Sequence, residues 1–396
     1  MCNETDDDMN ILFYRYNSIC EPDILGVLTR LDHKVTEVTE EMKNKKLGAR
    51  GQMNLVSAAL KKQEYQMVFS VSFFPVISEV CNIFHIPYVS WVVDCPAMEL
   101  YSHSVRNSWN RIFLFDYALY EEFRSENPKK IFYLPLGADY VRLDSLLEHI
   151  TRQDREKYAA EVSFVGSLYT EKCPYNYLQE ESYLKGYLDG VTEAQVKVYG
   201  YNFLEECITE EILQAFKEKV PFYQFPERAE HNEQAAMAHL YLGSKVTEQE
   251  RLRLLKRVSE EFELDLYTSS DFSVLPRASY RGIASAATAM PKIFHLSRIN
   301  LNFTSKPIRT GLPLRFWDIL GAGGFLLTNY QSEIPEYFEI GKDLEIYASE
   351  KELTDKIRYY LEHEEERAEI ARNGYEKAKE KYSLEIRIRQ MMRLVH

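Results

Sequence analysis

Two arginines and an aspartate are spaced so that they could hold a phosphate-bearing ligand. The segment PIRTGLPLRFWDILGAGGFLLTN (Pro307–Asn329) places Arg309 and Arg315 on either side of a Gly-Leu-Pro turn, directly before a predicted helix. A helix N-terminus carries a positive partial charge, and two guanidinium groups beside it suit a diphosphate. Asp318, early in that helix, could accept hydrogen bonds from two ribose hydroxyls. We predict ligand binding by this set; the alternative is a surface ion pair with a capping carboxylate.

A second candidate lies after the predicted strand EVSFV, where Gly166 and Ser167 follow. Glycine lets the backbone approach a ligand, and free N–H groups there can meet phosphate oxygens. The polar tail of Leu266–Ser270, at the end of another strand, could contact a base or ribose, although an ordinary turn fits equally well. We interpret Lys172 as a solvated lysine and Asn302 as structural.

The first part of the chain offers a carboxylate at a strand end. Asp94 follows the strand YVSWVV and precedes Cys95 and Pro96. A carboxylate at the carboxyl end of a parallel strand is well placed to accept a proton from a substrate hydroxyl. The alternative is that Asp94 caps the following turn. Asp116 is a weaker candidate of the same kind, and His85, between a helix and a strand, is expected to be structural.

Several common chemistries lack their motifs. The first strand ends in Tyr-Asn-Ser without the GxGxxG turn of a dinucleotide site, and GxxxxGK[ST] does not occur in the chain. The six cysteines are scattered, with no CxxC pair and no histidine at zinc-ligand spacing, so neither a zinc site nor a disulfide framework is predicted. They are Cys2, Cys20, Cys81, Cys95, Cys173 and Cys207.

The elements that must position these residues alternate between short apolar strands and helices. This alternation predicts parallel β-α-β units in two doubly wound sheets, whose ligands bind at the carboxyl ends of the strands. In the first part we expect strands at 11–16, 34–38, 65–71, 88–93, 112–116 and 131–136. In the second part we expect them at 161–165, 195–201, 264–267, 299–303, 325–328 and 344–347.

The fold class expected is therefore α/β, with two Rossmann-like domains. We predict an N-terminal domain over residues 1–150 and a C-terminal domain over 151–381, with a helical insertion at about 202–261. Residues 175–261 offer no large independent apolar set, which favours an insertion over a third domain. Residues 382–396 are expected to form a last helix that packs back on the N-terminal domain.

Composition excludes other classes of protein. The 396 residues include 48 Lys plus Arg against 61 Asp plus Glu, a formal net charge of −13, which argues against a general nucleic-acid or anionic-membrane binder. The acidic N-terminus lacks the basic start and apolar run of a signal peptide, so we expect a cytoplasmic protein without a transmembrane segment. The basic, amphipathic stretch Glu380–Leu394 could bind a membrane surface, but helix packing is the favoured interpretation.

Five segments of the chain resemble one family. YVSWVVDCP, FVGSLY, PKIFHLSRINLNFTS, the Pro307–Asn329 segment and IARNG resemble the spore-maturation-type bacterial glycosyltransferases, in a branch with an uncharacterised N-terminal domain. The resemblance implies a GT-B fold, in which two Rossmann-like domains face each other across a cleft. It further implies a nucleotide-sugar donor on the C-terminal domain, an acceptor on the N-terminal domain, and no required metal or cofactor.

Carried over by residue, the family's Arg-x-Phe-Glu-like element falls on Arg315 to Asp318, with Asp in place of Glu. Retaining GT-B enzymes often have two glutamates eight positions apart, here Thr310 and Asp318, so the first acid is missing. The resemblance implies that Thr310 and Gly311 also contact the donor, and that Asp94 is the base if the anomer is inverted. If the anomer is retained, Asp94 would orient the acceptor.

Three functions stay open on the sequence. The leading one is transfer of a sugar from a nucleoside diphosphate sugar to a protein, lipid-linked or small-molecule acceptor. A non-catalytic GT-B partner subunit is the second, favoured by the missing acid at Thr310 and by the insertion. The third is a nucleotide-sugar epimerase, which would form a new sugar nucleotide without an acceptor.

Overall fold

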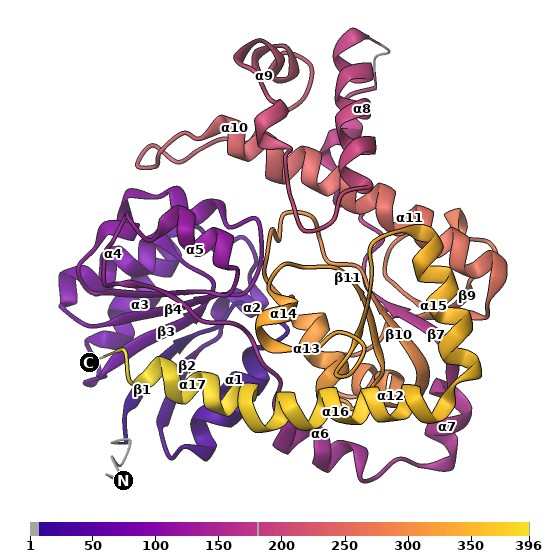
Figure 1. Cartoon of the computed structure of the whole chain (residues 1–396). Coiled ribbons are helices and arrows are strands. Elements are labelled where there is room, and N and C mark those ends of the chain that lie inside the picture. The colour runs from indigo at the N-terminus through magenta and orange to yellow at the C-terminus, as the bar shows by residue number, and fades with distance from the viewer. Residues whose placement is uncertain (1–7, 180–181, 396) are drawn as a thin grey trace. The chain divides into compact units, whose positions relative to one another are not determined.

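A computed structural model describes residues 8–179 and 182–395 (Figure 1). The chain divides into two compact units. Unit 1 takes the residues through Asp139, the segment Phe225–His231, and the end of the chain from Tyr382. Unit 2 takes Tyr140–Gln224 and Asn232–Lys381.

Unit 1 is built on a six-stranded parallel sheet of order β2-β1-β3-β4-β5-β6. The central strands β3 (MVFSV) and β4 (YVSWV) are buried along their whole length, as expected of strands covered on both faces. Its elements are β1 (Asn10–Tyr14), α1 (Glu21–Arg30), β2 (Lys34–Val38), α2 (Glu40–Lys43), α3 (Ala49–Leu60), β3 (Met67–Val71), α4 (Pro75–Phe84), β4 (Tyr88–Val92), η1 (Met98–Tyr101), η2 (His103–Arg106), β5 (Asn110–Leu114), α5 (Tyr117–Phe123), β6 (Ile131–Tyr133) and α17 (Leu384–Met392).

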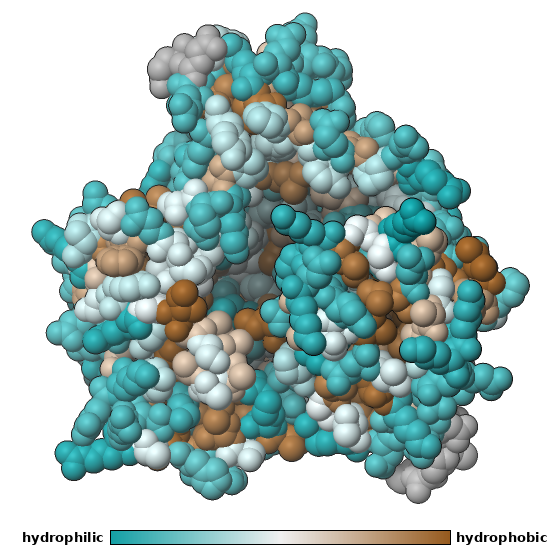
Figure 2. Space-filling model, turned by 180° about the vertical axis from the view of Figure 1, so that it is seen from behind, coloured by the Kyte–Doolittle hydropathy of each residue, from teal (hydrophilic) through white to brown (hydrophobic). Residues whose placement is uncertain are grey.

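The last helix, α17, belongs to unit 1, where it packs against α1 (Figure 1). The backbone N–H of Leu384 donates to the Ala138 carbonyl at 2.9 Å, and Leu384, Ile388 and Met391 are buried. The apolar face that could have bound a membrane surface is therefore covered by protein. Among the described residues, no helix is both long and apolar enough to span a membrane. Figure 2 shows mostly hydrophilic residues on the face it presents, with hydrophobic ones in separate patches.

Unit 2 has a second six-stranded parallel sheet, of order β12-β11-β10-β7-β8-β9. Helices α11 and α15 lie on one face of it, and α12 and α13 pack together on the other (Figure 1). Its elements are α6 (Tyr140–Leu147), α7 (Arg152–Tyr158), β7 (Ala160–Val165), η3 (Pro174–Tyr177), α8 (Tyr183–Val196), η4 (Glu205–Cys207), α9 (Glu210–Lys217), α10 (Glu233–Ala236), the π-helix η5 (Met237–Leu242), α11 (Gly243–Glu261), β8 (Leu264–Tyr267), η6 (Phe272–Val274), β9 (Ser279–Gly282), α12 (Ala289–Leu296), β10 (Ser297–Asn302), α13 (Leu314–Gly321), β11 (Leu326–Asn329), α14 (Ile334–Tyr337), β12 (Glu345–Tyr347), α15 (Glu350–Glu362) and α16 (Glu364–Tyr382).

Three expectations from the sequence are corrected here. The predicted strand at 195–201 is wrong, because Gln195 and Val196 close helix α8 and the Gln195 amide donates to the carbonyls of Val198 and Tyr201 at 3.2 and 2.9 Å. The predicted boundary at 150 falls inside unit 2, where Tyr375 donates to Asp144 at 2.6 Å. Strand β9 was not predicted, since its residues are mostly exposed and form no apolar run.

The insertion has a hydrophobic core of its own, against the expectation from the sequence. Seventeen buried residues between Cys173 and Val246 form one cluster, separate from the cluster that covers the sheet of unit 2. Phe216 lies near its middle, with its ring 5.1 Å from that of Tyr241. These apolar residues are spread over five helical segments and the loops between them, among charged residues, which hides the core from a search for apolar runs.

Candidate functional site

The predicted donor residues gather at the carboxyl edge of the unit 2 sheet. In the order β9-β8-β7-β10-β11-β12, successive connections leave in opposite directions from β7 and β10, so these two strands flank the topological switch point. Ligands of doubly wound sheets bind in the crevice outside the carboxyl ends of the strands at such a point. Gly166 and Ser167 follow β7, and Phe303 to Pro313 follow β10 and lead into α13.

Arg315 and Asp318 face each other on the first turns of α13. Arg315 Nη1 lies 3.1 Å from Asp318 Oδ2, and the Arg315 guanidinium also sits over the ring of Phe294 at 5.3 Å. Burial lowers the pKa of Arg315, and the Asp318 carboxylate offsets part of that effect. The Arg315 side chain is 20% exposed and that of Asp318 39%, so the carboxylate is the more accessible partner of the pair.

The loop that carries Arg309 is fixed from the neighbouring strand. Gln331, after β11, donates through Nε2 to the carbonyls of Ile308 and Gly311 at 3.3 and 3.1 Å. The Thr310 hydroxyl donates to Glu333 at 2.7 Å, and Glu333 is buried. The turn through Thr310 and Gly311 is therefore held rigidly before α13. Arg309, half-buried, sits in this fixed turn.

The loop after β7 is arranged differently from the prediction. The Gly166 N–H is not free for a ligand, because it donates to the Tyr267 carbonyl at 3.0 Å and continues the sheet ladder. The N–H of Leu168 donates to Ser270 Oγ at 2.8 Å, and that of Tyr169 to Ser167 Oγ at 2.9 Å. The amides of Gly166, Leu168 and Tyr169 are therefore used within the protein, two of them by β8 and the turn after it. Ser270, in that turn, has the structural role that was one of the two interpretations of Leu266–Ser270.

Two residues have the non-functional roles that the sequence predicted for them, one as a solvated side chain and one as a structural residue. Lys172 is exposed, with Nζ 5.9 Å from the Tyr169 ring. Asn302 is buried and donates to Thr304 and Thr328 at 3.1 and 2.9 Å, which orients the loop after β10.

Sequence reasoning missed Arg251, which lies at the switch point. This residue of α11 donates through Nη1 to the Ser167 carbonyl and through Nη2 to the Phe303 carbonyl, both at 2.6 Å. Its guanidinium lies over the Tyr169 ring at 4.8 Å. In the sequence Arg251 stands in the charged run EQERLRLLKR, which is typical of a solvated helix face. No signal in that run separates it from its neighbours.

The start of α11 sets the register that delivers Arg251. A Cβ on Gly243 would lie 3.0 Å from Pro307 Cγ, so glycine allows the helix to approach the β10 loop closely. One turn later, Thr247 Oγ1 accepts from the Lys306 N–H at 2.9 Å. Arg251 follows after one more turn, which brings its side chain to the same edge of the sheet.

In unit 1, Asp94 follows β4 at the carboxyl edge of the sheet and is exposed. Tyr16, after β1, shares a hydrogen bond of 3.2 Å with Ser72, after β3. Burial, with a smaller contribution from the Asp94 charge, raises the pKa of Tyr16 to about 12 and that of Cys20 to about 12. Asp94 thus stands in a neighbourhood of neutral hydroxyl and thiol groups.

The other two unit 1 candidates are structural. Asp116 is buried and caps α5 by accepting from the Leu119 N–H at 3.1 Å. His85 ends α4 in the left-handed conformation, with φ 54°, at the opposite edge of the sheet from Asp94. Within residues 8–179 and 182–395 no group of three or more His, Cys, Asp or Glu side chains could hold a metal ion.

Comparison with known proteins adds a family and a fold. Residues 249–393 match the family described as Glycosyl transferase-like. HepE from Anabaena, solved in complex with UDP and glucose, is similar with 12% identity, coverage of 97% of this chain and 98% of that chain, and a TM-score of 0.51. Sucrose-phosphate synthase from Thermosynechococcus elongatus is similar with 9% identity, coverage of 97% and 98%, and a TM-score of 0.53. A search of curated proteins found no significant match.

The structural likeness shows the α/β GT-B fold, and the family match, over the C-terminal residues 249–393, supports a glycosyltransferase enzyme. The matched residues include Arg309, Arg315 and Asp318, whereas Asp94 lies outside them.

Proposed function

We propose that this enzyme transfers a sugar from a nucleoside diphosphate sugar to an acceptor hydroxyl, with the donor held by unit 2. One observation carries the proposal. Arg315 and Asp318 are paired at the start of α13, beside the fixed turn of Arg309, at the edge of the sheet where doubly wound folds bind ligands. That edge combines cations with a half-exposed carboxylate, which is the chemistry that a diphosphate and a ribose require together.

Each donor residue has a proposed task. Arg309 and Arg315 stabilise the negative charge that grows on the leaving diphosphate, aided by the N-terminus of α13. Asp318 accepts from the ribose hydroxyls, and Thr310, Gly311 and Ser167 line the same site. A fixed positive pocket of this kind can replace a divalent cation, so we propose a reaction that needs neither metal nor cofactor.

UDP-sugars are the first donors to test, because the Anabaena HepE structures contain UDP with glucose and UDP-glucose. In unit 1, Asp94 is proposed to act on the acceptor, as its base if the anomer is inverted or as its orienting group if it is retained. The closer kinship with the spore-maturation-type bacterial enzymes, and a cytoplasmic location, belong to the same proposal.

The first test is a thermal-shift panel of UDP-, GDP-, CMP- and dTDP-linked sugars, with and without EDTA. A ligand that binds the folded protein adds about 2.7 kcal/mol of stability at a hundredfold excess over its dissociation constant. We expect one nucleotide class to raise the melting temperature, undiminished by EDTA, and to be consumed when an acceptor is supplied. No shift with any donor would refute the donor site.

A further inference from the structure

Arg251 spans the crevice between the two strands at the switch point of unit 2. Its two Nη groups hold the carbonyls of Ser167, after β7, and Phe303, after β10. A Cβ on Gly166 would lie 3.1 Å from the Phe164 ring, which is tight, and 3.7 Å from Arg251 Nη1, which is ordinary contact, so Gly166 lies directly beside the guanidinium. The residue therefore lies between the two loops to which we assign the donor.

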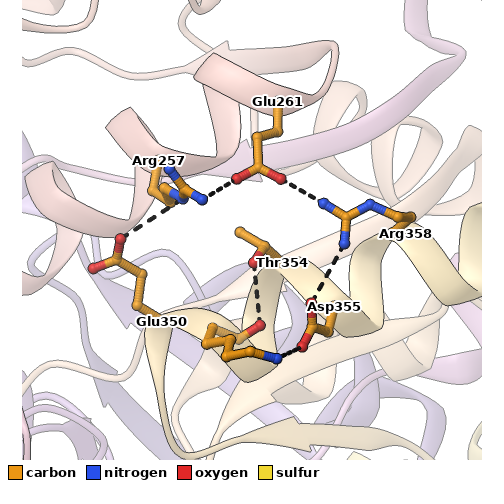
Figure 3. A network of polar contacts seen from close by, with 7 residues as sticks. Arg257, Glu261, Glu350, Thr354, Asp355 and Arg358 are labelled. Carbon is orange, nitrogen blue, oxygen red and sulfur yellow. Dashed lines mark hydrogen bonds and ion pairs between the residues drawn. The ribbon is translucent and has the colours of Figure 1, made fainter.

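The charge of Arg251 is not neutralised by an ion pair, unlike those of the other arginines on α11. Arg253 pairs with Glu193, and Arg257 pairs with Glu261 and Glu350 at 2.5 and 3.8 Å (Figure 3). Throughout the described part of the chain, Arg251 has no carboxylate within ion-pair distance. Carbonyl oxygens take up two of its five donors, and its Nε has no hydrogen-bond partner there.

Both signs of charge lie near Arg251. Burial lowers the pKa of Arg251, whereas Tyr169 and Glu250 raise it, and the nearby positive charge of Arg315 lowers it. The adjacent acid, Glu250, is 2% exposed and interacts with Tyr199 and Lys306. Burial raises the pKa of the Glu250 carboxyl, and its charge raises the pKa of Arg251. Half-buried cations are stabilised by an anionic partner, and a guanidinium fork matches phosphate oxygens.

We propose that Arg251 contacts the diphosphate of the donor at the switch point, in addition to holding the loops after β7 and β10. This inference rests on the proposed function and adds a residue that the sequence did not reveal. Because the guanidinium is already fixed by the two carbonyls, its charge is in place before the donor binds. The leaving diphosphate would then be met by Arg251, Arg309 and Arg315 together.

The test distinguishes a contact between Arg251 and the phosphates from a purely structural role in holding the two loops together. Binding of UDP and of uridine, which lacks the phosphates, is measured by calorimetry on the wild type, Arg251→Gln, Arg251→Lys and the control Arg253→Gln. We expect Arg251→Gln to weaken UDP by about 10- to 100-fold while uridine changes less than about twofold, since the lost contact is a charged hydrogen bond. Arg251→Lys should lose less, and Arg253→Gln should bind both ligands as the wild type does.

Two results would overturn the inference and leave the proposed function standing. One is wild-type UDP affinity in Arg251→Gln. The other is an equal loss of UDP and uridine in both Arg251 variants, which would mean that the residue shapes the loops alone. A wild-type protein that binds neither UDP nor inorganic pyrophosphate would refute the donor assignment and this inference together.

Discussion

The two units share one architecture but carry opposite chemistry at corresponding points. In unit 1 the strand order reverses between β1 and β3, and there the hydroxyl of Tyr16 meets that of Ser72 at 3.2 Å. In unit 2 it reverses between β7 and β10, and there the guanidinium of Arg251 joins the two loops. At the first switch point two hydroxyls meet and Lys45 donates to the Tyr16 carbonyl from one side, whereas at the second a guanidinium joins the two loops directly.

This difference matches the two substrates of a sugar transfer. A nucleoside diphosphate sugar is an anion and needs fixed positive charge, which unit 2 offers through Arg251, Arg309 and Arg315. An acceptor hydroxyl is neutral and needs a hydrogen-bonding partner and a carboxylate, which unit 1 offers in Asp94. Each unit has a parallel sheet with a carboxyl edge of the same kind, and we infer that the charge of the side chains at that edge determines which substrate it suits.

The largest effect on this contrast between the units is expected when Asp94, the carboxylate of unit 1, is neutralised. We expect Asp94→Asn to lower kcat by about 10²- to 10⁴-fold, the usual contribution of a general base, while the affinity for UDP stays at the wild-type value. Steady-state kinetics with UDP-sugar and calorimetry with UDP measure the two effects. Glu64→Gln, an exposed carboxylate before β3, is the control. Weaker UDP binding in Asp94→Asn would contradict the division of labour.

The second difference between the units is the insertion core of unit 2. Phe216 is fully buried there, so Phe216→Ala should destabilise the insertion by about 3–5 kcal/mol. Because this core is separate from the one that covers the sheet, we expect UDP binding to persist. Hydrogen exchange should speed up in α8 and α9 while β10 and β11 stay protected.

Tyr183→Ala, at the 85% exposed first residue of helix α8, which contributes to the same core, is the matched control and should change stability by less than about 0.5 kcal/mol. Equal loss of protection in α8 and β10 would show that the insertion and the sheet unfold as one piece.

The sequence predicts the sheets well because their strands are buried on both faces. MVFSV and YVSWV read as continuous apolar runs between helices, so β3 and β4 could be placed with little ambiguity. Strand β9 could not, because an exposed edge strand needs no apolar run. The segment at 195–201 reads as a strand by composition, yet the bonds of the Gln195 side chain decide its local structure.

The positions of Arg315 and Asp318 could be predicted because both follow a turn and a helix start, and their spacing of three places them on one side of the helix. The ion pair they form is the arrangement that the alternative interpretation predicted, so their binding of a donor stays a prediction. Arg251 could not be found in this way, because its contacts are with loops far along the chain. The prediction of a free amide at Gly166 is wrong, because that amide belongs to the sheet ladder, and the tight neighbour of a Cβ there would be the Phe164 ring.

The third prediction tests the cationic edge of unit 2. Arg315→Ala should weaken UDP by about 10- to 100-fold, because a charged hydrogen bond to the diphosphate is lost. At a UDP concentration a hundredfold above the wild-type dissociation constant, the stability added by UDP should fall from about 2.7 kcal/mol to about 0.4–1.4 kcal/mol, which thermal shift measures. The control Arg298→Ala removes a half-exposed arginine of β10 near the other end of the strand, and its UDP shift should match that of the wild type. A full shift in Arg315→Ala would place the donor elsewhere.

The smallest effect concerns the neutral pair of unit 1. Tyr16→Phe removes the 3.2 Å hydrogen bond to Ser72 and should cost about 1 kcal/mol of stability at pH 8, with UDP affinity unchanged. The pKa of Tyr16 is raised to about 12, so the folded protein holds this proton more tightly than the unfolded chain does. Stability from the neutral phenol is therefore complete below pH 10 and is lost as the pH rises towards 12. Urea unfolding at pH 8, 10 and 11 should show the wild type losing its advantage over Tyr16→Phe in that interval. A difference that stays constant with pH would mean that Tyr16 is not shielded from solvent, and the assignment of a buried, neutral hydroxyl pair to the unit 1 switch point would then be wrong.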